Sequence, residues 1–126
     1  MIKRERLYDA FGDLIYAIAL ADGQIQNVEV EVLSKILEGY KGATDIRWSF
    51  DYNRIKGKSV EETYQRAIEV CKENGPDPEY PFLIELMVKV AKAYKGIVPS
   101  EQIILEKFAT DLKAKFTSDL EKLKLL

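Results

Sequence analysis

Residues 14–33 of the chain read LIYAIALADGQIQNVEVEVL, and this stretch decides the fold. Its apolar residues recur at helical spacing up to a turn at Asp22-Gly23, after which a second helical pattern begins. Residues 86–105 read LMVKVAKAYKGIVPSEQIIL and repeat the same frame 72 positions later. We therefore expect one all-α domain over residues 1–126, a bundle of five to six helices built from two related helix–turn–helix halves at about 3–38 and 80–112.

The pattern of apolar and capping residues predicts helices at about 3–21, 26–37, 59–73 and 80–95, and another from Pro99. This last helix either continues to about residue 125 or gives way to a separate one at Ser118. Because few residues join them, the first two helices are expected to lie side by side. The segment 80–95 has the cleanest apolar pattern and is expected to be the most buried.

The segment 40–58 fits two interpretations. Ile46, Trp48, Phe50 and Tyr52 alternate with polar residues, which is typical of an extended strand, although part of the set also suits a helical turn. A short extended piece is slightly favoured, and the segment is left without an assigned structure.

Composition excludes several classes of function. A net charge of −2 with both signs mixed along the chain argues against nucleic-acid binding. No apolar run reaches the length of a membrane span, so we expect no membrane insertion and a cytoplasmic protein. The single cysteine, Cys71, cannot form an internal disulfide and is expected to be a buried thiol.

The chain has no histidine, which removes histidine-based nucleophilic catalysis and ordinary zinc hydrolase sites. It also has no glycine-rich phosphate loop, and no pair of carboxylates stands in an apolar setting that would raise a pKa. We therefore expect a protein that is not an enzyme, with a carboxylate-dependent hydrolase as a weak third possibility.

The motif Ala21-Asp22-Gly23-x-Ile25-x-x-x-Glu29 resembles that of the tellurite-resistance TerB-like family, whose members are all-helical domains of two such halves. The second half keeps the apolar frame and Glu101 but has Tyr94 and Lys95 in place of Asp22 and Gly23. The resemblance implies a stress-associated binding or scaffold module without a defined reaction. It also implies a divalent cation, such as calcium or magnesium, at the acidic turns, with Asp22, Glu29 and Glu101 as ligands.

The same acidic residues have a structural interpretation. Glu29 and Glu101 would occupy the third position of their helices, where a glutamate reaches back to a free backbone N–H, and Asp22 can cap its own turn. Capping is favoured over a cation site, and both stay open.

Trp48, Phe50 and Tyr52 lie outside the predicted helices. Such aromatic residues either strap a loop onto the core or anchor a protein partner. The alternative function is therefore a metal-free protein–protein interaction domain that acts through residues 40–55, with a second copy of the chain as one conceivable partner.

Overall fold

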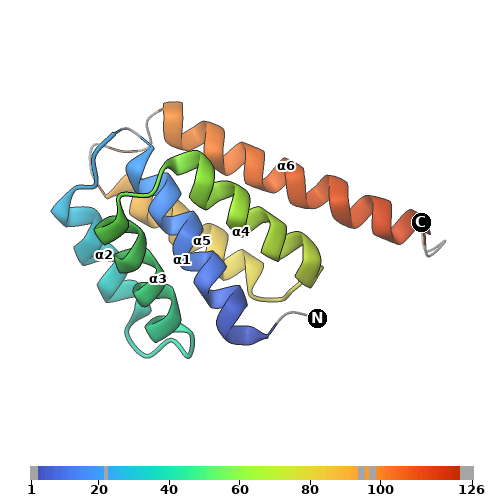
Figure 1. Cartoon of the computed structure of the whole chain (residues 1–126), viewed down its shortest axis with the longest axis horizontal. Coiled ribbons are helices and arrows are strands. Elements are labelled where there is room, and N and C mark those ends of the chain that lie inside the picture. Colours follow the sequence, from blue (N-terminus) through green and yellow to red (C-terminus); the bar gives the residue numbers. More distant parts are fainter. Residues whose placement is uncertain (1–2, 22, 94–95, 97–98, 123–126) are drawn as a thin grey trace.

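The computed structural model describes residues 3–21, 23–93, 96 and 99–122, and side chains up to Asp111. These residues form a bundle of six helices without a strand (Figure 1), which confirms the predicted all-α class. The elements are, in order, α1 (Arg4–Leu20), α2 (Asn27–Leu37), α3 (Ala43–Lys56), α4 (Val60–Asn74), α5 (Tyr80–Lys92) and α6 (Pro99–Lys122). The carboxyl-terminal segment continues as part of α6, so Ser118 does not begin a separate helix.

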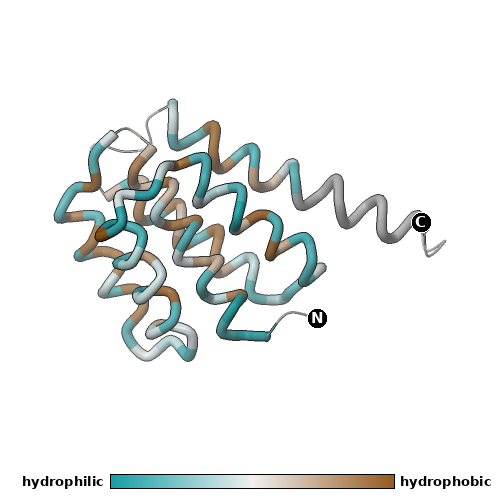
Figure 2. The backbone as a smooth tube through the Cα atoms, in the orientation of Figure 1, coloured by the Kyte–Doolittle hydropathy of each residue, from teal (hydrophilic) through white to brown (hydrophobic). Residues whose placement is uncertain are grey.

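Helix α1 is the centre of the bundle, and α3, α4, α5 and α6 all pack against it. Its residues from Ala10 to Ala19 are buried without interruption, so the prediction that 80–95 is the most buried segment is wrong. The physical reason is that α1 has helices on several sides. Apolar and polar residues alternate along the helices of the bundle (Figure 2), and Ala10 and Ala17 are small residues within the buried stretch of α1.

Gly12 fixes how closely α1 and α3 approach. A Cβ atom at this position would lie 2.4 Å from the carbonyl oxygen of Ile46 and 2.7 Å from Cβ of Ser49, both on α3. Backbone at such a distance cannot move away without displacing the helix. The absence of a side chain at Gly12 therefore places the buried face of α3 directly on α1.

Helix α2 does not lie along α1, contrary to the prediction drawn from their short connection. It packs instead against α5, while α6 packs against α1 and α4. Gly23, with φ 98°, lies between α1 and α2 in a conformation that favours glycine. The short connection therefore did not impose an antiparallel pair of α1 and α2, whereas α6 contacts its neighbour α5 as well as α1 and α4.

The favoured extended piece within 40–58 is also wrong, because α3 occupies most of this segment. Ile46 and Phe50 share one helical face and are buried, whereas Trp48 and Tyr52 share the opposite face. When a helix carries large residues on two opposite faces, large and polar residues alternate along a short stretch of its sequence, as they do in a strand. The alternation was real, but it came from two i, i+4 pairs and not from a strand.

Several local predictions are confirmed. Ser59 caps α4 by accepting a hydrogen bond from the backbone N–H of Glu62 at 3.1 Å, and Pro99 is the first residue of α6. Cys71 is buried in the core, and burial raises the pKa of its thiol to about 12. Among the described residues, no helix combines the length and apolarity that a membrane crossing requires.

Candidate functional site

The outer face of α3 carries large hydrophobic side chains that no other described part of the chain covers. Trp48, Tyr52 and Ile55 have exposed fractions of 60%, 38% and 83%. Their spacing of four and three residues places them in one row along the helix. The rings of Trp48 and Tyr52 stack with centroids 5.2 Å apart and an interplanar angle of 19°. We call these three residues the α3 ridge.

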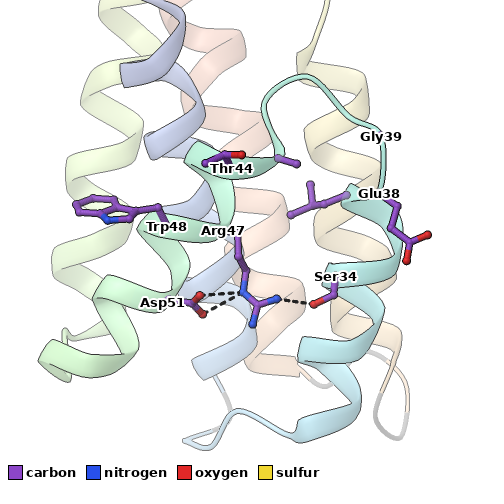
Figure 3. Close-up of a pocket in the computed structure, with 9 residues that line it drawn as sticks. Ser34, Glu38, Gly39, Thr44, Arg47, Trp48 and Asp51 are labelled. Atoms are coloured by element: carbon purple, nitrogen blue, oxygen red, sulfur yellow. Dashed lines mark hydrogen bonds and ion pairs between the residues drawn. The ribbon is translucent and has the colours of Figure 1, made fainter.

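A groove of about 580 Å³ lies on one side of the ridge, between α2 and α3 (Figure 3). Arg47 crosses it, donating hydrogen bonds to the carboxylate of Asp51 at 3.0 and 3.1 Å and to the hydroxyl of Ser34 on α2. In Figure 3 the indole of Trp48 points away from α2, so that it borders this groove without filling it. The remaining lining comes from Leu37, Glu38, Gly39, Ala43 and Thr44.

A second groove, of about 370 Å³, lies on the other side of the ridge, where α3 and α4 flank α1. We call it the acidic groove; its lining residues are Arg6, Asp9, Ala10, Asp13, Trp48, Ser49, Tyr52, Arg66 and Val70. Trp48 lines both grooves and therefore stands on the boundary between them.

The floor of the acidic groove is a hydrogen-bonded network around the buried carboxylate of Asp13. Its Oδ1 accepts hydrogen bonds from the side chains of Asn53 at 2.7 Å, Ser49 at 2.9 Å and Arg66 at 2.9 Å. Arg66 also donates to Asn53 Oδ1 at 3.0 Å. Because these donors come from α3 and α4, the network joins both helices to α1 and leaves Asp13 fully engaged.

Asp9 lies one helical turn before Asp13 and has no ion pair or hydrogen bond to its carboxylate among the described side chains. Partial burial and the negative charges of Asp45 and Asp13 raise its pKa to about 6, against the opposing effect of Arg66. Sequence alone does not identify this raised pKa, because Asp9 and Asp45 lie 36 positions apart and the charge of Asp45 acts on Asp9 only when α3 packs on α1.

The three predicted partner-binding aromatic residues do not share one surface. Trp48 and Tyr52 are on the exposed ridge, whereas Phe50 is 1% exposed and belongs to the core. Its ring contacts Tyr16 of α1 edge-on, with centroids 6.1 Å apart. Phe50 therefore anchors α3 to the bundle, and Ile55, which the sequence did not single out as a binding residue, completes the exposed row.

Of the three predicted cation ligands, the structure places two. Glu29 is 2% exposed and forms a capping box with Gln26, in which Glu29 Oε1 accepts a hydrogen bond from the backbone N–H of Gln26 at 2.7 Å. Glu101 is also buried, in the first turn of α6. Asp22 lies outside the described residues. Within the described part of the chain, no three acidic or cysteine side chains gather in a way that would hold a metal ion.

A second polar cluster ties the start of α1 to two loops. Arg4 pairs with Asp77, at 2.5 Å, and with Glu79, whose carboxylate also accepts hydrogen bonds from the hydroxyls of Tyr8 and Tyr40. Burial opposes ionisation of Glu79, but these hydroxyls and Arg4 outweigh it and hold its pKa below the usual value. Every charge here has a partner, so this cluster is a structural clamp.

Comparison of the chain with protein families, with curated proteins and with solved structures finds no match. The TerB-like resemblance, the stress-associated role and the cation that it implies therefore stay predictions. The proposed function is therefore inferred from the α3 ridge and its two grooves.

Proposed function

We propose that the protein is a non-enzymatic interaction module that binds a segment of another protein on the α3 ridge. The observation that carries the proposal is the row Trp48, Tyr52 and Ile55, which stands in solvent although α3 has a separate buried face. Aromatic side chains with a pocket on either side are the usual anchors of protein interfaces. A hydrophobic row of this kind is unusual on a helix that packs only against its own chain.

The packing of α3 supports this role. Ile46 and Phe50 hold the helix on α1, and Ser49 and Asn53 fix it through Asp13, so the ridge is not needed to keep α3 in place. A rigid helix that presents preformed aromatic rings loses little conformational entropy on binding. The two grooves beside Trp48 offer space for side chains of the partner segment.

Catalysis is less well supported by the same residues. The carboxylate of Asp13 already accepts hydrogen bonds from Arg66, Asn53 and Ser49. Among the described lining residues, Asp9 therefore has no second carboxylate that could act with it as an acid or base. A general acid or base acts on a substrate that other groups hold and polarise. A surface for binding accounts for the exposed aromatic rings, whereas a hydrolytic site does not.

The test is selection of binders from a library of phage-displayed peptides, followed by affinity measurements on variants. We expect the selected peptides to bind Ile55→Ala and Trp48→Ala at least tenfold more weakly than the unaltered protein. Ile103→Ala is the matched control, because Ile103 is 63% exposed on α6 and away from the ridge, and it should bind as the unaltered protein does.

Two outcomes would overturn the proposal. In the first, the selection yields no peptide whose binding depends on Trp48. In the second, sedimentation velocity shows a dimer that Trp48→Ala dissociates, which would make a second copy of the chain the occupant of the ridge and not a different protein.

A further inference from the structure

Two carboxylates and two guanidinium groups line the acidic groove, and among these four Asp9 is the one without an ion pair. Asp13 is neutralised by Arg66, and Arg6, which is 59% exposed, points to Glu73 at 4.0 Å. Asp9 and Asp45 have no cationic partner among the described residues, and they repel each other. Two carboxylates brought together by packing and left without a counter-charge are an arrangement that a cation from outside would stabilise.

One wall of the same groove is aromatic. Trp48 and Tyr52 both line it, at the side of α3 that also carries Asp45 in the first turn of the helix. The faces of indole and phenol rings attract cations, and a planar guanidinium can stack on such a face while donating to a carboxylate. The groove therefore offers a carboxylate and an aromatic surface together.

We propose that the acidic groove receives an arginine side chain of the partner segment, with its guanidinium stacked beside Trp48 and paired with Asp9. The proposal rests on the proposed function, and it specifies the partner as a segment with an arginine next to hydrophobic residues that cover the ridge. Arginine is favoured over lysine because the site combines an aromatic face with a carboxylate, which suits a planar, weakly hydrated cation.

Binding of arginine in this groove depends on pH. Partial burial and the negative charges of Asp45 on α3 and of Asp13 and Glu5 on α1 raise the pKa of Asp9 to about 6, and Arg66 on α4 opposes them. A neutral Asp9 cannot form the ion pair. Affinity should therefore be full at pH 7.5 and at least fivefold lower at pH 5.

The first experiment uses N-acetyl-arginine amide as the probe and N-acetyl-citrulline amide as its uncharged isostere. Trp48 is the single tryptophan of the chain and lines both grooves, so its fluorescence reports binding beside the ridge, and the variants below assign the response to one groove. We expect the arginine compound to cause a saturable change in the fluorescence of Trp48, and the citrulline compound to bind at least tenfold more weakly. Equal responses to the two compounds, including no response to either up to their solubility limits, would overturn the proposal.

The matched variants are Asp9→Asn and Asp51→Asn. Asp9→Asn should lower the affinity for the arginine compound about tenfold and abolish the dependence of that affinity on pH. Asp51 lies in the other groove, so Asp51→Asn should change neither the affinity nor its dependence on pH. Selected peptides whose binding depends on Trp48 distinguish the arginine site from the interaction module. If replacing their arginines by citrulline changes nothing, the arginine site is refuted and the interaction module survives; if no peptide needs Trp48, the module itself is refuted.

Discussion

The guanidinium of Arg66 on α4 donates to both carboxylate oxygens of Asp13 on α1, at 3.1 and 2.9 Å. Asp13 has 6% of its side chain exposed and Arg66 has 45%. The acid is therefore the desolvated member of the pair, and its ionised form depends on donors from two other helices.

Removal of this acid should be costly. Asp13→Ala leaves Asn53 without its buried acceptor, whereas Ser49 keeps the backbone carbonyl of Asp9. The substitution should lower the free energy of unfolding by about 2–3 kcal/mol, since exposed Arg66 can regain water. Urea denaturation followed by circular dichroism measures the loss. Asp51→Ala breaks only the exposed pair with Arg47 and should cost less than about 0.5 kcal/mol. Equal losses in the two variants would contradict this description of the network.

Two aromatic residues on α3 should differ sharply in their effect on stability. Phe50→Ala empties a site in the core and should cost about 3–5 kcal/mol. Trp48→Ala removes an exposed ring and its stacking on Tyr52, for a loss of about 1 kcal/mol or less. The comparison uses urea unfolding of both variants. A large loss for Trp48→Ala would mean that the ring is part of the fold and not a surface for a partner.

Asp9 should destabilise the folded protein at neutral pH. Its pKa is raised from an ordinary value near 3.8 to about 6, so the folded state holds the proton more tightly than the unfolded state does. Between these two values stability falls as pH rises, and the full penalty is present above pH 6. Allowing for solvent screening, Asp9→Asn should stabilise the protein by roughly 1 kcal/mol at pH 7.5.

The same substitution should have little effect at pH 4, where Asp9 is already largely neutral in the folded state. Unfolding of both proteins in urea at the two pH values gives the difference. A stabilisation that is the same at pH 4 and pH 7.5 would show that Asp9 has an ordinary pKa.

Glu29 tests whether the acidic turn caps a helix or holds a cation. Glu29→Ala should lower the free energy of unfolding by about 1 kcal/mol through loss of the capping box. If capping is its whole role, the loss is the same in a chelator and in millimolar calcium or magnesium. A loss that grows when the cation is present would support the site that the TerB-like resemblance implies.

The sequence predicts the helices well where a single apolar face decides their structure. The bounds of α4 and α5 follow from Ser59, from the turn at Gly75 and from regular apolar spacing, and each is local information. The prediction failed for α3, because Trp48 and Tyr52 are large residues on the exposed face of the helix and alternate with the buried Ile46 and Phe50. The helix α1 was predicted, but its continuous burial was not, because burial of Asp13 depends on donors that lie 36, 40 and 53 positions away.

The candidate site was predictable only in part. The aromatic residues of 40–55 were predicted either to strap a loop onto the core or to bind a partner, but the helical register that buries Phe50 and exposes Ile55 was not visible in a period of two. The raised pKa of Asp9 comes from partial burial and from the charge of Asp45, and Asp45 acts on it because α1 and α3 approach each other closely, as at Gly12. Local patterns carry no information about such a contact.

A partner that covers the α3 ridge must change the environment of Trp48, and the fluorescence of this residue reports that change. A selected peptide is titrated into the protein while the emission maximum and the quenching by iodide are followed. We predict a shift to shorter wavelength and reduced quenching at saturation, because the exposed indole becomes buried. Saturated binding that leaves both the emission and the quenching of Trp48 unchanged would contradict the account.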